Sequence, residues 1–319
     1  MTETQARRRG ARPLIYVGPD RDHFGPEHAD TFLEAVERGG GKVADTPEDA
    51  EAIVWLGSEI SRLPDLLHPG VRWVQLPSAG VEPWTEKGLL DTERIYTSAA
   101  GAYADTVAEH ALALMLAGAR RLHECARATR WEVGWGRKFA GSTVVILGAG
   151  GIGRALIRLL EPFGVRVLAV TRSGRDVPGA IESYAASETD ELWPRGDFFV
   201  VAAPATGATK HMIGASQLAA MKSDAWVVNV ARGSLVDTDA LVEALAAGSI
   251  GGAALDVTDP EPLPEGHPLW TEPSALITPH AANPPDALAR ALAERIEENM
   301  ARFKAGEPLI GVVDVEAGY

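Results

Sequence analysis

The sequence is poor in several features that would place it in other classes of protein. It has a single cysteine, Cys125, among 319 residues, which excludes an intrachain disulfide and a cysteine-based metal cluster. We therefore expect no bound metal and a reduced, cytoplasmic setting. Basic residues are outnumbered by acidic ones, 30 to 44, which argues against a nucleic-acid partner, because such binding depends on Lys and Arg neutralising phosphates.

Long apolar segments are also missing. No apolar run approaches the roughly 18 residues of a membrane helix, so we expect no membrane partner. Residues 1–12 are rich in basic side chains but lead into no apolar stretch of the secretory type, and we interpret them as a loose arm. The chain does have 46% hydrophobic residues, enough for packed cores, and a length that suggests about two domains.

Short apolar runs alternate with helical patterns along the whole chain. A helix-forming stretch runs from about Tyr103 to Leu122, and a second alternating unit spans Ser142 to Asn283. An amphipathic helix, Pro285–Lys304, follows that unit. This rhythm predicts an α/β protein with two doubly wound parallel sheets. In the first hundred residues the predicted strands and helix are Pro13–Val17, Ala29–Arg38, Lys42–Ala44, Ala52–Leu56, Val71–Leu76 and Arg94–Thr97.

A glycine-rich turn stands between an apolar run and a helical pattern at Thr143–Arg154, TVVILGAGGIGR. Gly148 permits a tight turn, Gly150 lets the backbone approach a pyrophosphate, and Gly153 lets the helix pack closely on the strand. Phosphates would then lie at the helix N-terminus, against Gly151 and Ile152, where amide donors and the helix dipole favour negative charge. In this strand–turn–helix context the motif predicts a dinucleotide-binding site of the Rossmann type.

The end of the next apolar run, Val165–Val170, indicates which dinucleotide is preferred. A carboxylate at this position would bind the ribose 2′-hydroxyl of NAD, but the run ends in Thr171, Arg172 and Ser173. A 2′-phosphate would be bound by the arginine and the hydroxyls and repelled by an acid. We therefore predict a preference for NADP(H), resting mainly on Arg172, with NAD(H) as a possible second cofactor.

Three polar residues follow the ends of later apolar runs. Arg232, Glu261 and His280 come after AWVVNV, GAALDV and SALIT. Ligands of parallel sheets bind just beyond the carboxyl ends of the strands, so these side chains are expected to converge on one edge. An arginine, a carboxylate and an imidazole can together bind an anion and transfer a proton.

From about Leu76 to Asn283 the chain resembles the D-isomer-specific 2-hydroxyacid dehydrogenases, and more narrowly the glyoxylate/hydroxypyruvate reductases among them. The order and spacing of the matching segments agree throughout. These segments are PSAGVE (77–82), AAGAYADTVAEHAL (99–112), VVILGAGGIGRAL (144–156), AAPATGATKHMI (202–213), VVNVARGSLVDTDALVEAL (227–245), GAALDVTDPEPLP (252–264) and HPLWTEPSALITPHAAN (267–283).

The resemblance implies an enzyme that reduces a 2-keto acid to a D-2-hydroxy acid with a hydride from NAD(P)H. It assigns Arg232 to binding and polarising the substrate, His280 to general acid/base catalysis and Glu261 to pairing with that histidine. Both Arg232 and His280 would touch the substrate. Its carboxylate would also be bound by backbone amides of Ala79, Gly80 and Val81.

Further cofactor contacts and the domain boundaries also follow from the resemblance. The contacts are Ala203 and Pro204 at a strand end, Val230 and Ala231 beside the nicotinamide, and Asp256, for which a structural role at a strand end is the alternative. Residues 1–101 with 287–319 would form a flavodoxin-like substrate domain, and residues 102–286 the dinucleotide-binding domain. Because the carboxylate-binding loop and the catalytic residues then come from different domains, the site is expected to form fully only when the cleft closes.

Two further expectations concern partners and the alternative function. Trp131 and Trp135 are interpreted either as packing in a homodimer interface or as reaching the substrate pocket of the other subunit. The alternative function is a nucleotide-sensing, corepressor-like member of the same family. Such a binding protein would not need Arg232, Glu261 and His280 together.

Overall fold

The computed structural model describes residues 12–131 and 134–318, so the predicted arm lies outside the described residues except for Arg12. The chain divides into two compact units. Unit 1 combines Met1–Tyr103 with Pro284–Tyr319, and unit 2 is the intervening segment Ala104–Asn283. The chain thus crosses from one unit to the other twice, at 103/104 and at 283/284.

Unit 1 is built on a five-stranded sheet in the order β2-β1-β3-β4-β5, with every pair parallel. The described strands lie within the predicted apolar runs or extend one residue beyond them. Its strands are β1 (Leu14–Gly18), β2 (Lys42–Val43), β3 (Ala52–Trp55), β4 (Trp73–Gln75) and β5 (Ile95–Thr97). Its helices are α2 (Ala29–Arg38), α3 (Leu63–Leu66), α4 (Glu82–Glu86) and α10 (Pro285–Ala305), with 3₁₀ turns η1 (Arg21–Phe24), η2 (Pro26–His28), η3 (Pro47–Asp49) and η4 (Ile60–Arg62).

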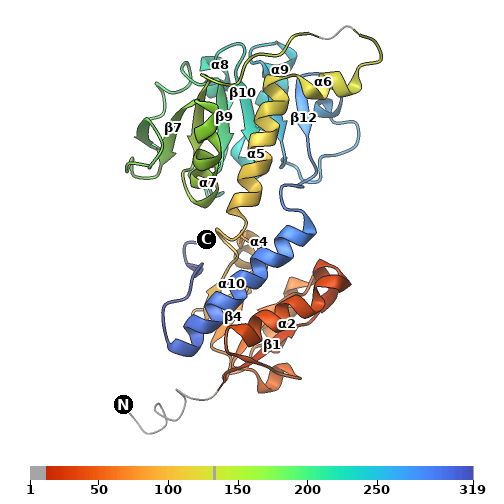
Figure 1. The fold of residues 1–319 in the computed structure, drawn as a ribbon, viewed down its shortest axis with the longest axis vertical. Helices are drawn as coiled ribbons and strands as arrows, with labels where there is room; N and C mark the ends of the chain where they lie inside the picture. The colour runs from red at the N-terminus through yellow and green to blue at the C-terminus, as the bar shows by residue number, and fades with distance from the viewer. Residues whose placement is uncertain (1–11, 132–133, 319) are drawn as a thin grey trace. The chain divides into compact units, whose positions relative to one another are not determined.

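The carboxyl-terminal helix α10 belongs to unit 1, where it lies beside α2 (Figure 1). Its apolar side chains Leu292, Ile296 and Met300 are fully buried. The ring of Phe303, near its end, lies 5.3 Å from the ring of Trp73 on β4. Unit 1 is therefore completed by a segment that follows β5 by almost two hundred residues.

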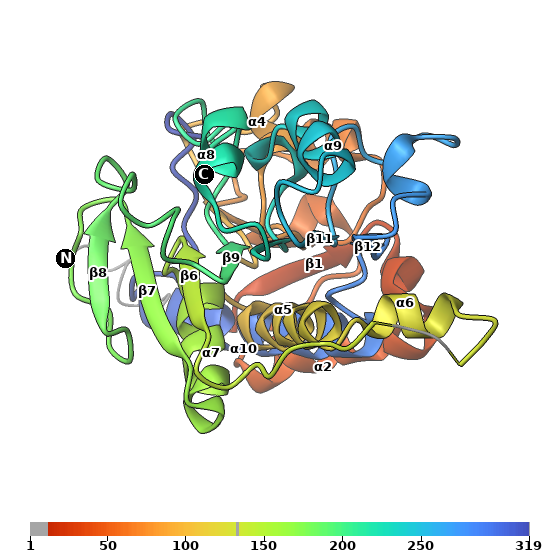
Figure 2. The same cartoon turned by 90° about the horizontal axis from the view of Figure 1, so that it is seen from above.

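Unit 2 is built on a seven-stranded sheet in the order β12-β11-β10-β9-β6-β7-β8, again with every pair parallel. The order reverses between β6 and β9, as it does in a Rossmann fold. Figure 2 shows β8, β7 and β6 in sequence along this sheet. The strands are β6 (Thr143–Leu147), β7 (Arg166–Thr171), β8 (Glu182–Ala185), β9 (Phe198–Val201), β10 (Trp226–Asn229), β11 (Gly252–Leu255) and β12 (Ala275–Ile277).

The helices of unit 2 differ from the prediction at one place. The predicted helix from Tyr103 to Leu122 ends at Ala119, and a second short helix begins at Leu122, because Arg121 adopts a left-handed conformation with φ 52°. None of the helices that the structure describes combines the length and the apolar character needed to cross a bilayer. The helices are α5 (Ala104–Ala119), α6 (Leu122–Arg127), α7 (Gly151–Leu160), α8 (Ala215–Ala220) and α9 (Thr238–Ala246), with 3₁₀ turns η5 (Glu161–Phe163), η6 (Gly233–Leu235) and η7 (Pro268–Trp270).

Candidate functional site

The glycine-rich turn connects β6 to α7 as predicted. Gly148 has φ 105°, and a Cβ there would lie 2.5 Å from the amide nitrogen of Ala203 after β9, so only glycine fits. A Cβ at Gly150, the residue before α7, would meet nothing within 4 Å. The first amides of a helix have no partner within the helix, and they favour an anion. This cradle fits a pyrophosphate.

The end of β7 carries the residues expected at the adenosine ribose. The hydroxyl oxygen of Thr171 is buried, and it has no hydrogen-bond partner among the described residues. Arg172 and Ser173 follow it and are exposed. A hydroxyl and a guanidinium at successive positions after a strand are suited to a ribose phosphate, because both groups can donate to its oxygens.

The remaining residues expected at the cofactor lie along the same edge of the sheet. Ala203 and Pro204 follow β9, which pairs with β6, while Val230 and Ala231 follow β10, which pairs with β9. The Val230 and Ala231 side chains are buried, whereas Pro204 is exposed. These positions extend from the fingerprint turn toward the strands that carry the polar residues.

His280 and Glu261 form a hydrogen-bonded pair. The distance between His280 Nδ1 and Glu261 Oε1 is 2.6 Å, and their side chains are 51% and 41% exposed, so the pair is accessible to a substrate. A carboxylate can only accept, so Nδ1 carries the hydrogen and Nε2 is directed away from Glu261. His280 follows β12, while Glu261 lies in the loop after the neighbouring β11.

Arg232 follows β10, on the other side of β11. Arg232 Nη1 donates to the backbone carbonyl of Ala231 at 2.7 Å. The side-chain amide of Asn229 donates to the backbone carbonyl of Arg232 at 2.8 Å. The next residue, Gly233, packs so closely that a Cβ would lie 1.9 Å from the carbonyl oxygen of Thr258, after β11. The loops carrying Arg232 and Glu261 are therefore packed directly against each other.

Asp256 directly follows β11 and is only 2% exposed. Burial alone would raise the pKa of its carboxyl, but hydrogen bonds from His110, Thr278 and the Ala281 amide outweigh it and lower the pKa to about 2. The carboxylate thus stays charged inside unit 2 and binds groups on both sides of His280. Its assignment to the nicotinamide amide stays a prediction.

The lowered pKa makes the stability of the protein pH-dependent. The folded pKa of Asp256 lies below the ordinary 3.8, so the carboxylate stabilises the fold above pH 3.8 and loses this effect as the pH falls through 2. We expect Asp256→Asn to cost about 2 kcal/mol at neutral pH, with the difference vanishing near pH 2. The urea midpoint measured across this range checks it. The exposed Asp190→Asn is the control, and a pH-independent loss in Asp256→Asn would contradict the linkage.

The predicted carboxylate-binding loop, Ala79–Val81, lies in unit 1 between β4 and α4. The Ser78 hydroxyl donates to the carbonyl of Gly80 at 2.6 Å, and the Tyr103 hydroxyl donates to the carbonyl of Pro77 at 2.6 Å. Burial raises the pKa of Tyr103, which keeps its hydroxyl protonated as that donor. The loop is therefore held in one conformation from within its own unit.

A buried polar network under this loop was missed by sequence reasoning. The Thr97 hydroxyl and the Asn299 amide both donate to Gln75 Oε1, at 2.8 and 3.0 Å, and all three side chains are fully buried. Gln75 ends β4, four residues before Ala79, whereas Asn299 belongs to α10. A polar residue within an apolar run was the only available signal, and the partner in α10 could not be inferred from spacing.

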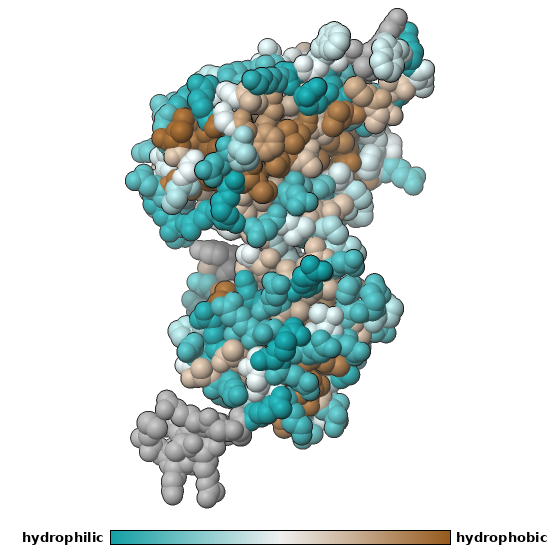
Figure 3. Space-filling view, in the orientation of Figure 1, coloured by the Kyte–Doolittle hydropathy of each residue, from teal (hydrophilic) through white to brown (hydrophobic). Residues whose placement is uncertain are grey.

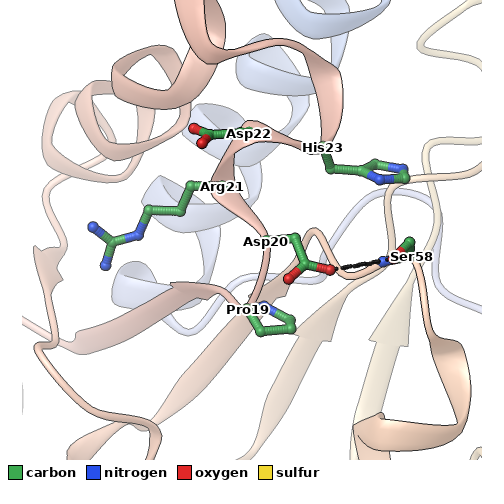
Figure 4. A pocket seen from close by; sticks show the side chains of 6 residues that line it. All are labelled: Pro19, Asp20, Arg21, Asp22, His23 and Ser58. Carbon is green, nitrogen blue, oxygen red and sulfur yellow. Dashed lines mark hydrogen bonds between the residues drawn. The ribbon is translucent and has the colours of Figure 1, made fainter.

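A hollow of about 710 Å³ lies in unit 1 at the carboxyl ends of β1 and β3, where the strand order reverses. It is lined by Pro19, Asp20, Arg21, Asp22, His23 and Ser58. Figure 4 shows Asp20 turned toward Ser58, whose amide and hydroxyl donate to it at 3.2 and 3.3 Å, and Arg21 directed to the other side. Its lining side chains are mostly exposed and mixed in charge.

The nucleotide cradle and the polar strand-end residues of unit 2 are features of a dinucleotide-dependent enzyme. The sequence model for the NAD-binding domain of D-isomer specific 2-hydroxyacid dehydrogenases matches residues 112–282. The chain belongs to this family.

Individual relatives agree with that assignment. The chain is 42% identical over 304 residues to an uncharacterized protein from the proB 3′ region of Corynebacterium melassecola, covering 92% of this chain and 98% of that one. It is 38% identical over 239 residues to a glyoxylate reductase of Korarchaeum cryptofilum, covering 71% and 70%. A crystal structure of an NADPH-dependent glyoxylate/hydroxypyruvate reductase from Sinorhizobium meliloti, in complex with NADP and sulfate, is similar with a TM-score of 0.79, 27% identity and 97% and 100% coverage.

Proposed function

We propose that the protein is an NADPH-dependent reductase of a small 2-keto acid, of the glyoxylate or hydroxypyruvate kind, yielding the D-2-hydroxy acid. The His280–Glu261 pair at the strand edge beside the nucleotide cradle carries this proposal. The similarity to the glyoxylate reductase of Korarchaeum and to the glyoxylate/hydroxypyruvate reductase of Sinorhizobium supports it. In this proposal unit 2 binds the dinucleotide.

Arg232 would bind the substrate in this reaction. A guanidinium is permanently charged and presents a planar fork of donors, so it can bind the carboxylate and the keto oxygen of one substrate together. Donation to the keto oxygen draws electron density from the carbonyl carbon and stabilises the charge that develops on oxygen. Backbone amides of Ala79–Val81 are proposed as additional carboxylate donors.

His280 would transfer the proton. A reduced nicotinamide, when bound, would supply the hydride. As negative charge develops on the keto oxygen, protonated His280 donates from Nε2, while Glu261 accepts from Nδ1 and stabilises the imidazolium. In the oxidative direction the neutral imidazole accepts the hydroxyl proton at Nε2, and the same hydrogen bond keeps the ring oriented.

We propose that the enzyme uses NADP(H) in preference to NAD(H), because Thr171, Arg172 and Ser173 stand where an acid would select NAD. The buried, unpartnered hydroxyl of Thr171 and the exposure of Arg172 support this. The similar reductase from Sinorhizobium meliloti is NADPH-dependent, which agrees with this preference.

Replacing Arg172 with alanine tests the preference. A charge-assisted hydrogen bond to the 2′-phosphate is lost, so we expect the Kd for NADPH to rise roughly 10-fold and that for NADH to change little. Quenching of protein fluorescence by each cofactor measures both constants. Arg175→Ala, in the same exposed loop, controls for general positive charge. Equal changes in the Kd for the two cofactors would show that Arg172 does not bind the 2′-phosphate.

A panel of 2-keto acids assayed with NADPH and NADH tests the function itself. We expect glyoxylate or hydroxypyruvate to be reduced with loss of absorbance at the nicotinamide band. Larger 2-keto acids in the same panel define the substrate range. Tight NADPH binding with no turnover of any 2-keto acid would overturn the enzyme assignment and favour a nucleotide-sensing role.

We further propose that the protein is a cytoplasmic homodimer. Figure 3 shows hydrophobic side chains gathered on the face of unit 2 where α5 lies. Leu112 and Leu116 on α5 are only partly buried, and Leu122 on α6 is exposed. The side chains of Trp131 and Trp135 are fully exposed in the single chain. Apolar surface of this kind favours association with a second copy. The mass measured by light scattering distinguishes a dimer from a monomer.

A further inference from the structure

The carboxylate of Asp256 is surrounded by donors that belong to the segment carrying His280. The Thr278 hydroxyl donates to Oδ1 at 2.5 Å, and the backbone amides of Ala281 and Ala282 donate to Oδ1 and Oδ2 at 2.8 and 3.2 Å. The backbone carbonyl of Asp256 accepts from the amide of His280 at 2.8 Å. One residue therefore binds the chain before, at and after the proposed proton donor.

The chain needs this support because His280 adopts an unfavourable backbone conformation. Its φ is 51°, in the left-handed region that residues other than glycine rarely occupy. Such a conformation persists only where the surrounding structure holds it. The bonds from residues 278–282 to Asp256 are the contacts that hold it, and they leave the His280 ring directed to Glu261.

His110, from another element, also belongs to this group. It lies on α5 with a side chain that is 21% exposed, and its Nε2 lies 3.0 Å from Thr278 Oγ1 and 3.3 Å from Asp256 Oδ1. Because the Thr278 hydroxyl already donates to Asp256, its oxygen is available to accept, and the Nε2 hydrogen can be shared between the two oxygens. His110 thus connects the long helix of unit 2 to the segment that carries His280.

We propose that His110 is a positioning residue for proton transfer, which holds Asp256 and Thr278 in place and through them keeps His280 in its left-handed conformation against Glu261. This inference rests on the proposed reductase function. The imidazole of His110 contacts Thr278 Oγ1 and Asp256 Oδ1, so it acts on His280 through these two residues. Loss of the His110 side chain should therefore reduce the fraction of molecules in which the His280 imidazole is correctly placed. This should lower kcat, with little change in the KM for glyoxylate or the Kd for NADPH.

Paired substitutions separate positioning from packing. His110→Met keeps the length of the side chain and removes the donor, whereas His110→Gln keeps an N–H donor at the reach of Nε2. We expect His110→Met to lower kcat for glyoxylate roughly 10- to 100-fold, as misplacement of a catalytic group does. The KM for glyoxylate and the Kd for NADPH should stay within about twofold, and His110→Gln should recover most of the loss. Glu109→Gln, at the preceding, exposed position of α5, is the control and should behave as wild type.

A second readout does not depend on turnover. The readout is the NMR spectrum of protein whose histidine side chains are isotopically labelled. The His280 signal is identified as the one that is missing from the spectrum of His280→Asn. We expect His110→Met, but not His110→Gln, to shift this signal and move its titration midpoint, and to move the corresponding limb of the pH profile of kcat/KM. If the wild type reduces no 2-keto acid while the signal still responds in this way, the reductase assignment fails and the positioning role stands. An unchanged His280 signal in His110→Met overturns the inference whatever the turnover, and so does an equal loss of kcat in both variants.

Discussion

Asparagine in place of His280 should reduce the turnover of 2-keto acids by about 10²- to 10⁴-fold, the range that a positioned general acid contributes. Asparagine tolerates the left-handed conformation observed at this position, with φ 51°, so the loop should keep its shape. It cannot donate or accept a proton as imidazole does. Steady-state kinetics with NADPH should therefore show a fall in kcat, while the Kd for NADPH measured by fluorescence stays within about twofold.

His211 offers a matched control for this substitution. It is also a left-handed histidine, with φ 51°, and its Nδ1 lies 3.6 Å from the carboxylate of Asp237. His211→Asn removes the same kind of side chain from the same backbone conformation, and we expect it to keep nearly full activity. Unchanged turnover in His280→Asn, or equal losses in the two variants, would remove His280 from the acid/base role.

Removal of the Arg232 side chain should have the second large effect. If the guanidinium makes two charge-assisted hydrogen bonds to the substrate, each of about 1.5–3 kcal/mol, Arg232→Ala should lower kcat/KM by about 10²- to 10⁴-fold. Arg232→Lys keeps the charge but loses the planar fork, so its kcat/KM should lie between those of the wild type and Arg232→Ala. The measurement is kcat/KM over a range of glyoxylate concentrations, with the Kd for NADPH measured separately.

Arg158 serves as the control for loss of a positive charge in unit 2. It pairs with Asp105 at 2.8 Å, but the two side chains are 66% and 87% exposed. An ion pair this exposed contributes little to the stability of the fold. Arg158→Ala should leave kcat/KM unchanged. If Arg232→Ala also keeps its kcat/KM, the substrate is bound by other groups, and the proposed mechanism is wrong at its first step.

Much of the fold could be predicted because buried parallel strands are nearly uninterrupted apolar runs. The runs at Ala52–Leu56 and Ala225–Val230 contain β3 and β10, whose ends differ from the predicted ones by at most one residue. The fingerprint turn was also predictable, since Gly148 is required by a positive φ and a close neighbour. The pairing of His280 with Glu261 followed from the family resemblance and agrees with their observed distance of 2.6 Å.

The supporting residues could not be predicted, because their roles depend on contacts between distant segments. His110 stands in a helix rich in alanine and leucine, and nothing in its neighbourhood points to Asp256, far along the chain. Asn299 meets Gln75 only because α10 returns to unit 1. The end of α5 at Ala119 depends on one backbone angle at Arg121, a residue type with good helix propensity. Local sequence favoured continuation, and the tertiary structure overrode it.

The group around Asp256 also bears on how the chain is assembled from two units. His110 lies shortly after the first crossing point, and Ala281 and Ala282 lie immediately before the second. Segments near both ends of unit 2 therefore contact a single carboxylate. Unit 2 is thus an insertion in the chain whose first and last residues lie near each other. Segments with adjacent ends can be transplanted without long linkers. We therefore expect that residues 104–283 can be exchanged as a unit between relatives. The resulting chimera should have the cofactor preference of the protein that supplied this unit.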